Sequence, residues 1–361
     1  MNKKRFIIVG AIFSFFVVAF IGLVIVYNSS IQEVETNEDE ITTINFIVES
    51  GSTTAQIIDS LYNDKLIKSK YAAYIFLKLN NDYMMQAGAY ELNTGMTLDE
   101  ILTKISNGDV IDNSITVTFV EGKRITNYVK VIHKNFGYSE DEILDILSDK
   151  KYLQELIDKY WFLTEDILND KLYYALEGYL APNTYFFDKN ASIKQIVEKL
   201  LNTTEVELNK VKDETKNSKY SVHELLTMAS IVELEGANSN DRYGVAGVFY
   251  NRLQSGWSLG SDVTTYYAEQ IEMSDRDLYQ AELDEVNDYN TRSASMAGKL
   301  PVGPICNPGV ESIKAATQPQ EHDYFYFVAD KNKKTYFAKT YSEHVSTINK
   351  LKKDGLWYTY E

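Results

Sequence analysis

Apolar residues at helical spacing dominate the chain behind Ser221 and predict the element around which the rest is organised. Glu224 follows Ser221 by three residues, a capping box in which hydroxyl and carboxylate each accept a hydrogen bond from a backbone N–H. The apolar period predicts a helix over 222–234. Gly236 breaks the pattern, and a second helix is predicted over 242–253. The stretch is therefore expected to form a helix–loop–helix.

Two carboxylates, Glu233 and Glu235, lie at the C-terminal end of the first of these helices. An acid is unfavourable there because the helix dipole places negative partial charge at that end. Residues two apart on a helix do not face each other, so the two cannot act as a paired acid and nucleophile. We expect one to serve structure, paired with Arg242 or Arg252, and the other to lie in a cleft.

Alternating and helical patterns also divide the rest of the chain into elements. The N-terminal part is predicted to have the element order β-α-α-β, followed by a helix and a strand. The predicted strands cover 45–49, 87–92 and 115–120, and the predicted helices cover 54–63, 71–79 and 97–106. Later helices are predicted over 139–147, 150–158 and 193–209, and a terminal hairpin over 324–329 and 335–338. The expected fold class is α+β.

A run of 22 residues without charge, Phe6–Tyr27, follows three basic residues and precedes an acidic stretch. A helix of that length spans ~33 Å, which is enough for a bilayer core. Basic residues stay cytoplasmic, so the pattern predicts a single-pass transmembrane helix within 1–27, with the rest of the chain extracytoplasmic. A signal peptide cleaved near Asn28 is the alternative. Residues 28–43 are polar and acidic, as in a linker.

Composition removes several classes of function. A net charge of −16 argues against a nucleic-acid partner, which would require a basic stripe. The single cysteine, Cys306, excludes an intramolecular disulfide and a multi-cysteine zinc site. The four histidines are scattered without ligand spacing, so we expect neither a metal nor a cofactor.

Several ordered motifs resemble the MltG (YceG-like) family, whose members are membrane-anchored endolytic murein transglycosylases. They are ASIVELEG (229–236), DRYGVAGVFYNRL (241–253), LGSDVTTYY (259–267), YNTR (289–292), GKLPVGPICNPG (298–309) and YFYFVAD (324–330). Two positions depart from the family pattern: Gly236 stands where Thr is frequent, and Val263 replaces the proline of an Asp-Pro-Thr motif. Neither departure removes a carboxylate.

The resemblance implies a domain order. It comprises a cytoplasmic start and transmembrane helix over 1–27, a linker over 28–43, a LysM-like βααβ module over 44–118 and a larger α+β YceG-like catalytic domain over 119–361. For the LysM-like module, glycan contact and a purely packing or spacing role are both open.

The resemblance also places the catalytic acid on the second glutamate of the motif, Glu235. From the helix geometry above, we expect Glu233 and Arg242 to be structural or supporting residues. Expected substrate-binding residues are Asp262, Thr264, Asn290 and Asn307. Capping of a helix that starts near Thr264 is the commoner role for Asp262. The segment 298–309 holds three of the five prolines, and we expect it to face Glu235 across a glycan groove. Packing on the terminal hairpin is the alternative.

The chemistry implied is cleavage of the MurNAc–GlcNAc bond of peptidoglycan. Most glycosidases use two carboxylates, whereas a lytic transglycosylase needs one, which protonates the leaving oxygen and then activates the muramyl 6-hydroxyl to give a 1,6-anhydro end. Alternatives are a non-catalytic wall-binding or scaffold protein and a muramidase-type hydrolase in which Asp262 activates water. Expected partners are glycan strands, the bilayer, penicillin-binding proteins and other wall-synthesis proteins.

Overall fold

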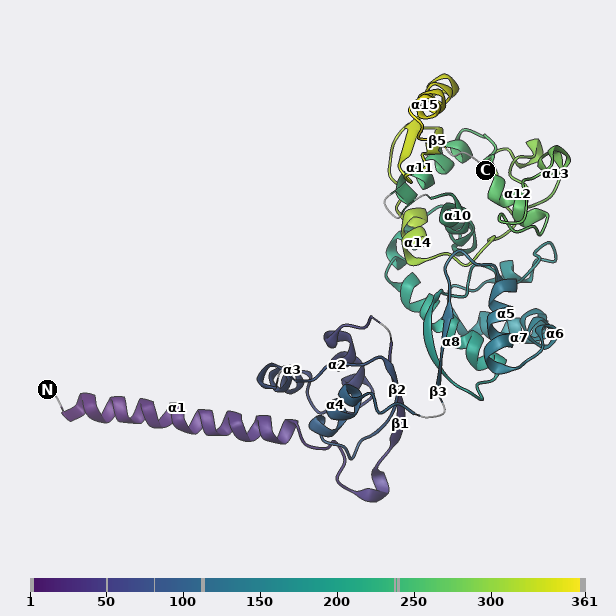
Figure 1. Cartoon of the computed structure of the whole chain (residues 1–361). Coiled ribbons are helices and arrows are strands. Elements are labelled where there is room, and N and C mark those ends of the chain that lie inside the picture. Colours follow the sequence, from purple (N-terminus) through teal and green to yellow (C-terminus); the bar gives the residue numbers. More distant parts are fainter. Residues whose placement is uncertain are drawn as a thin grey trace. The chain divides into compact units, whose positions relative to one another are not determined.

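The structure is a computed structural model of the 361-residue chain. It describes residues 3–49, 51–80, 82–111, 114–236, 238 and 241–357, without the side chains of residues 3–13. The chain divides into two compact units, one comprising Met1–Val117 with Thr184–Lys189 and the other Thr118–Asn183 with Asn190–Glu361. Each unit is a mixture of helices and short strands, in agreement with the α+β class (Figure 1).

The first unit opens with α1 (Lys3–Ser30), a helix of 28 residues that contains the uncharged run. Within the residues described with their side chains, no helix is both long enough and apolar enough to span a bilayer. Part of the expected membrane-spanning segment, up to residue 13, lies outside that description. The 3₁₀ helix η1 (Glu38–Glu40) lies in the acidic stretch that follows α1.

The remainder of the first unit has the expected order β1 (Thr43–Val48), α2 (Thr54–Asn63), α3 (Lys70–Leu79), β2 (Gly88–Asn93) and α4 (Leu98–Asn107). The strands β1 and β2 pair antiparallel, with Phe46 opposite Tyr90. Both side chains are buried in one apolar core with residues of α2 and α4. The predicted capping box at Thr97 and Glu100 is present and starts α4.

The second unit is mainly helical. Its helices, with two 3₁₀ turns, are α5 (Ile125–Phe136), α6 (Glu140–Ser148), α7 (Lys150–Lys159), η2 (Glu165–Leu168), α8 (Ile193–Asn209), α9 (Lys212–Asn217), α10 (Val222–Glu235), α11 (Asp241–Gln254), α12 (Asp262–Ala268), α13 (Gln280–Asp284), η3 (Ala294–Met296), α14 (Val310–Thr317) and α15 (Tyr341–Lys353). The strands β5 (Tyr326–Ala329) and β6 (Thr335–Ala338) form a two-stranded sheet in this unit. The strands β3 (Ser114–Phe119) and β4 (Asn183–Asp188) form another two-stranded sheet, and most of their residues belong to the first unit.

Helix α10 is the centre of the second unit. Ten of its residues, from His223 to Glu233, are buried, and α11, α12 and α14 all contact it (Figure 1). The predicted capping box is present, because the N–H of Glu224 donates to Ser221 Oγ at 3.2 Å and the N–H of Ser221 donates to Glu224 Oε2 at 2.7 Å. A helix buried on all sides fixes its last residues rigidly, which positions the two carboxylates at its end.

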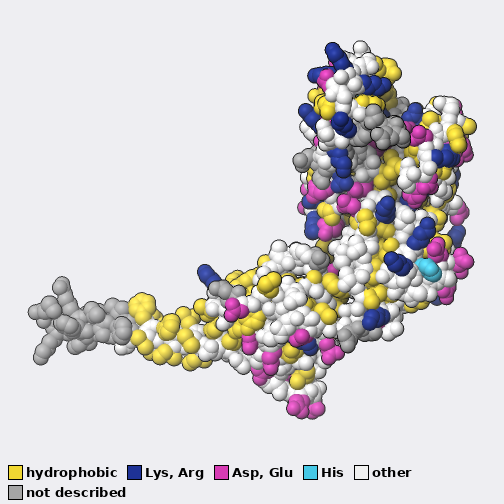
Figure 2. Space-filling view, in the orientation of Figure 1, with side chains coloured by type: hydrophobic (Ala, Val, Ile, Leu, Met, Phe, Trp, Pro, Cys, Tyr) yellow, Lys and Arg dark blue, Asp and Glu magenta, His cyan; other side chains and the backbone are white. Residues whose placement is uncertain are grey.

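Basic side chains gather over α15 at the end of the second unit that is uppermost in Figure 2. The last turn of α15 contains Lys350, Lys352 and Lys353. Cations at this end of a helix are favoured by the helix dipole. The chain thus combines a strongly acidic net charge with locally basic surfaces.

Candidate active site

Glu235 is the last residue of α10 and is half-buried. Its Oε1 accepts a hydrogen bond of 2.6 Å from Ser261 Oγ. Burial raises the pKa of Glu235, and the negative charge of Asp262 raises it further; the Ser261 hydrogen bond and the Arg252 charge act in the opposite direction. Glu235 is therefore a carboxyl group held toward its protonated form beside one hydroxyl donor.

A network of hydroxyl groups fixes Ser261. The Ser261 N–H donates to Thr291 Oγ1 at 3.1 Å, and Thr264 Oγ1 donates to the Ser261 carbonyl at 2.7 Å. The hydroxyls of Thr264 and Thr291 lie 2.8 Å apart, and all three residues are buried. Because these bonds fix the Ser261 backbone, the hydroxyl that contacts Glu235 is pre-positioned.

Arg252 holds the segment that carries Ser261. Its Nε donates to the Phe325 carbonyl at 2.8 Å, and its Nη1 donates to the Leu259 carbonyl. The guanidinium also lies over the Tyr326 ring, 5.7 Å from its centroid. Arg252 therefore links the second helix of the helix–loop–helix, the terminal hairpin and the loop beneath Glu235.

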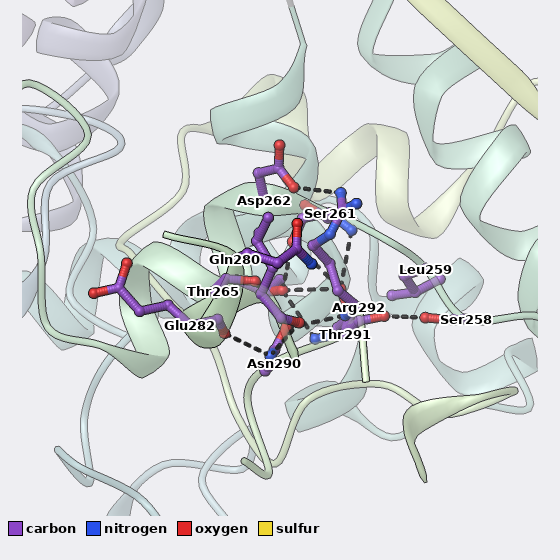
Figure 3. Close-up of polar contacts among 12 residues, drawn as sticks. Ser258, Leu259, Ser261, Asp262, Thr265, Gln280, Glu282, Asn290, Thr291 and Arg292 are labelled. Carbon is purple, nitrogen blue, oxygen red and sulfur yellow. Dashed lines mark hydrogen bonds and ion pairs between the residues drawn. The ribbon is translucent and has the colours of Figure 1, made fainter. Parts of the chain in front are cut away.

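Asp262 follows Ser261 and begins α12. The N-cap residue is Ser261 and makes no side-chain cap, so the helix-capping role expected for Asp262 was wrong. Asp262 Oδ1 instead forms an ion pair of 2.5 Å with Arg292, and its side chain is 58% exposed (Figure 3). Asp262 thus stands at the surface beside Glu235, where a role in substrate binding stays a prediction.

Glu233 has the opposite environment. Its Oε1 accepts from Arg242 Nη2 at 2.7 Å, so the expected pairing with Arg242 is present. Its Oε2 accepts from the Gly309 N–H at 3.0 Å and from Ser312 Oγ at 2.7 Å, and the side chain is 5% exposed. Both oxygens are engaged, which makes Glu233 a link between α10, α11 and the start of α14.

Asn290 does not present its amide to a substrate. Its Oδ1 accepts from Thr265 Oγ1 at 2.8 Å and from the Arg292 N–H at 3.1 Å, while its Nδ2 lies within 3.2 Å of three backbone carbonyls (Figure 3). The residue is fully buried. The expected sugar contact is therefore wrong, because every polar atom of the amide is already used inside the protein.

Thr264 and Asn307 are likewise buried and occupied. The Thr264 hydroxyl belongs to the network around Ser261. The Asn307 Oδ1 accepts from the N–H groups of Gly178 and Leu180, both at 3.1 Å, and its Nδ2 donates to Glu177 Oε1 at 3.3 Å. Their expected substrate contacts are corrected in the same way: both side chains stabilise the backbone that surrounds the site.

The proline-rich segment 298–309 packs against the buried side of α10 and not opposite Glu235. The Val302 carbonyl lies 2.9 Å from His223 Nε2, and the Ile305 N–H donates to Ser230 Oγ at 3.0 Å. With the Gly309 contact to Glu233, these bonds follow one face of the helix, and at about 100° per residue Glu235 points away from it. The expected groove wall is wrong: Pro301 and residues 303–309 are buried, and only the start of the segment, Gly298 and Lys299, is exposed.

Two supporting residues were not predicted from the sequence. Ser261 read only as part of a polar loop, since nothing in its spacing indicates a partner 26 residues earlier. Glu177 is buried, and its carboxylate accepts from the Ile125 N–H at 2.9 Å and from the Tyr267 hydroxyl at 3.2 Å. Burial raises the pKa of Glu177 to about 8, against the effect of these donors. Its position in the motif LEGYLAPNTY was the available signal.

A polar cavity of about 280 Å³ adjoins the end of α10. Its lining includes Glu233 and Leu234 of α10 together with Lys123, Val263 and Glu272, and does not include Glu235 or Asp262. Within the described residues, no group of three or more His, Cys, Asp or Glu side chains is arranged to hold a metal ion. The candidate acid is thus the carboxyl of Glu235, with a raised pKa, at the end of a buried helix on an α+β scaffold.

This scaffold and its motifs define a known family. The model of the YceG-like family matches residues 46–350, and the chain belongs to that family. A crystal structure of a YceG-like protein from Listeria monocytogenes superposes with a TM-score of 0.60 at 33% sequence identity, covering 85% of this chain and 99% of that one.

Two named relatives align with most of this chain. It is 36% identical over 326 residues to the endolytic murein transglycosylase of Bacillus subtilis, covering 90% of this chain and 89% of the relative. It is 26% identical over 332 residues to the endolytic murein transglycosylase of Streptococcus pneumoniae, where it covers 87% of this chain and 59% of the longer relative.

Proposed function

We propose that this chain is an endolytic murein transglycosylase that cleaves the MurNAc–GlcNAc bond within nascent peptidoglycan strands and leaves 1,6-anhydro-MurNAc ends. The names of its relatives support the substrate and the reaction class. The observation that carries the mechanism is the Glu235 carboxyl, half-buried, with a raised pKa and a single hydroxyl donor.

In the first step Glu235 donates its proton to the leaving glycosidic oxygen as the oxocarbenium-like state develops. The carboxylate then removes the proton of the muramyl 6-hydroxyl, whose oxygen attacks the anomeric carbon and closes the anhydro ring. Ser261 is well placed to orient the carboxyl and to stabilise the charge that it acquires after the first step. The cycle returns the proton to Glu235.

A hydrolase remains the competing function. It would require a second carboxylate as nucleophile or base. Glu233 is a poor candidate, since Arg242, Gly309 and Ser312 occupy both its oxygens. Asp262 is exposed and its Oδ1 is paired with Arg292, whose positive charge lowers the basicity of the carboxylate. The arrangement favours the one-carboxylate reaction.

Product analysis distinguishes the two reactions. Uncrosslinked glycan strands are digested with the full chain, and the fragments are examined by mass spectrometry before and after borohydride reduction. A transglycosylase yields anhydro-muramyl ends that borohydride does not change. New reducible ends would indicate a hydrolase, and intact strands would favour a non-catalytic wall-binding protein.

We further propose that α1 anchors the chain in the cell membrane, with the N-terminus cytoplasmic and the remainder extracytoplasmic. The uncharged run and the basic residues that precede it support this topology. The β1-α2-α3-β2 order supports a LysM-like module after the anchor. A reporter enzyme fused after Glu361 should be active only outside the membrane; a mature N-terminus near Ser30 would refute the anchor. Penicillin-binding proteins stay proposed partners.

A further inference from the structure

One face of α3 is exposed and apolar, although nothing in the catalytic proposal uses it. Tyr71 is 81% exposed, Ile75 50% and Leu79 69%, with Tyr74 and Lys78 exposed between them. At about 100° per residue these five side chains form one continuous stripe. The opposite face packs into the core of the unit through Ala72, Ala73, Phe76 and Leu77.

The segment that contains α3 is basic, although the chain as a whole is acidic. Residues 65–80 contain four lysines and no Asp or Glu, whereas the whole chain carries −16. Lys70 pairs with Asp59 at 2.7 Å. Lys65, Lys68 and Lys78 are exposed and form no ion pair within the part of the chain that the structure describes. Asp64 and Asp82 flank the segment at its two ends.

We propose that this face of α3, with Lys68 and Lys78, docks on the surface of an anionic lipid bilayer. Tyrosine side chains favour the boundary between headgroups and acyl chains, and lysines reach the phosphates. Ile75 and Leu79 enter the apolar boundary. The lipid surface is the partner that uses both the aliphatic residues and the unpaired lysines.

A glycan strand fits this face less well. Sugars are recognised by hydrogen bonds that their hydroxyl groups donate to carboxylates and exchange with amides, together with stacking on aromatic rings. The stripe on α3 contains neither a carboxylate nor an amide, and two of its five side chains are aliphatic. A convex helix face also encloses no ligand, whereas a membrane is a flat partner that such a face can lie upon.

Site-specific lipid quenching tests the proposal on the full chain. The native Cys306 is buried, so a cysteine placed at Leu79 can be labelled alone with an environment-sensitive fluorophore. The matched control is Asn45→Cys, an exposed residue of β1 in the same unit. Vesicles contain spin-labelled lipid and either phosphatidylcholine alone or its mixture with phosphatidylglycerol, and only protein that floats with vesicles is measured.

Strong quenching at position 79 in the anionic vesicles, with little at position 45, is the expected result. Each lysine near an anionic surface contributes about fivefold to binding, so Lys68→Glu combined with Lys78→Glu should lower the docked population by more than tenfold and remove the quenching. Because flotation is recorded separately, a failure of the α1 anchor and a failure of this face are distinguishable.

Four outcomes would overturn the proposal. In the first two, the protein floats but the fluorophore at position 79 is not quenched, or quenching is equal at positions 79 and 45. In the third the fluorophore responds to glycan strands without vesicles, and in the fourth it responds only to protein concentration. The third outcome would assign the face to glycan, and the fourth to a second copy of the chain.

Discussion

The two sides of α10 at its C-terminal end differ in how they surround a glutamate side chain. On one side the Glu233 carboxylate has an arginine, a backbone N–H and a hydroxyl on its two oxygens and is almost inaccessible. On the other, two residues later, Glu235 is half-buried and accepts from one hydroxyl. Identical functional groups on one helix thus take up structural and chemical roles because of what surrounds them.

The number of occupied acceptor sites on each carboxylate, more than its burial, separates the structural role of Glu233 from the proposed catalytic role of Glu235. A carboxylate with all its acceptor sites used cannot receive or deliver a proton without breaking those bonds. Glu235 keeps one oxygen without a protein partner within the described residues.

The largest effect is expected for Glu235→Gln. A glutamine keeps the shape of the side chain but cannot donate the proton, and general acid–base catalysis contributes ~10²–10⁴-fold. Turnover on glycan strands should fall by that factor while the melting temperature stays near that of the parent protein. Wild-type turnover in the glutamine variant would show that the acid lies elsewhere.

Glu233→Gln should invert this pattern by acting on stability. Breaking a buried ion pair and leaving Arg242 without its partner costs about 3–5 kcal/mol. Denaturant unfolding measures this loss, with Asp323→Asn as the control, since its pair with Lys339 is exposed and should contribute little to stability. Equal losses in the two variants would contradict the structural role of Glu233.

Asn290→Ala is expected to destabilise the fold, although the sequence alone predicted a loss of turnover with little change in stability. The buried amide serves Thr265 and three backbone carbonyls, and leaving such groups unpaired should cost about 3 kcal/mol. Thermal unfolding beside Asn209→Ala, an exposed asparagine, checks this. An Asn290→Ala variant that keeps its stability and shows only a raised KM would support the sugar contact instead.

Ser261→Ala should produce the smallest but most specific change. The Ser261 hydroxyl lowers the pKa of Glu235, so its removal raises that pKa further. Because the acid must be protonated, the alkaline limb of the pH–rate profile should move to higher pH. Ser258→Ala, which removes a hydroxyl bonded to the Thr291 carbonyl, should leave the limb in place.

Much of the fold followed from local patterns. The helix behind Ser221 and the first-unit helices were predicted within about one residue, because capping boxes and apolar periods are local signals. Helices α5, α14 and α15 were not predicted. For α15 the capping box of Thr340 and Glu343 was the local signal available in the sequence.

The site was only partly predictable, for a physical reason. Spacing on one helix separated Glu233 from Glu235, and the resemblance selected Glu235 as the candidate acid. Asn290 and Asn307 are amides, and nothing in a sequence tells whether an amide hydrogen-bonds a sugar or the protein's own backbone. That depends on contacts between residues far apart, such as Asn307 with Gly178.

Direct titration of Glu235 tests the central claim most closely. The full chain is prepared with ¹³C at the glutamate side-chain carboxyls, and the signal absent from Glu235→Gln is followed against pH by NMR. Burial beside Asp262 predicts that this signal titrates clearly above the ordinary glutamate pKa of about 4.3. Titration at or below that value would mean that Glu235 is ionised at neutrality, and would contradict its role as the proton donor.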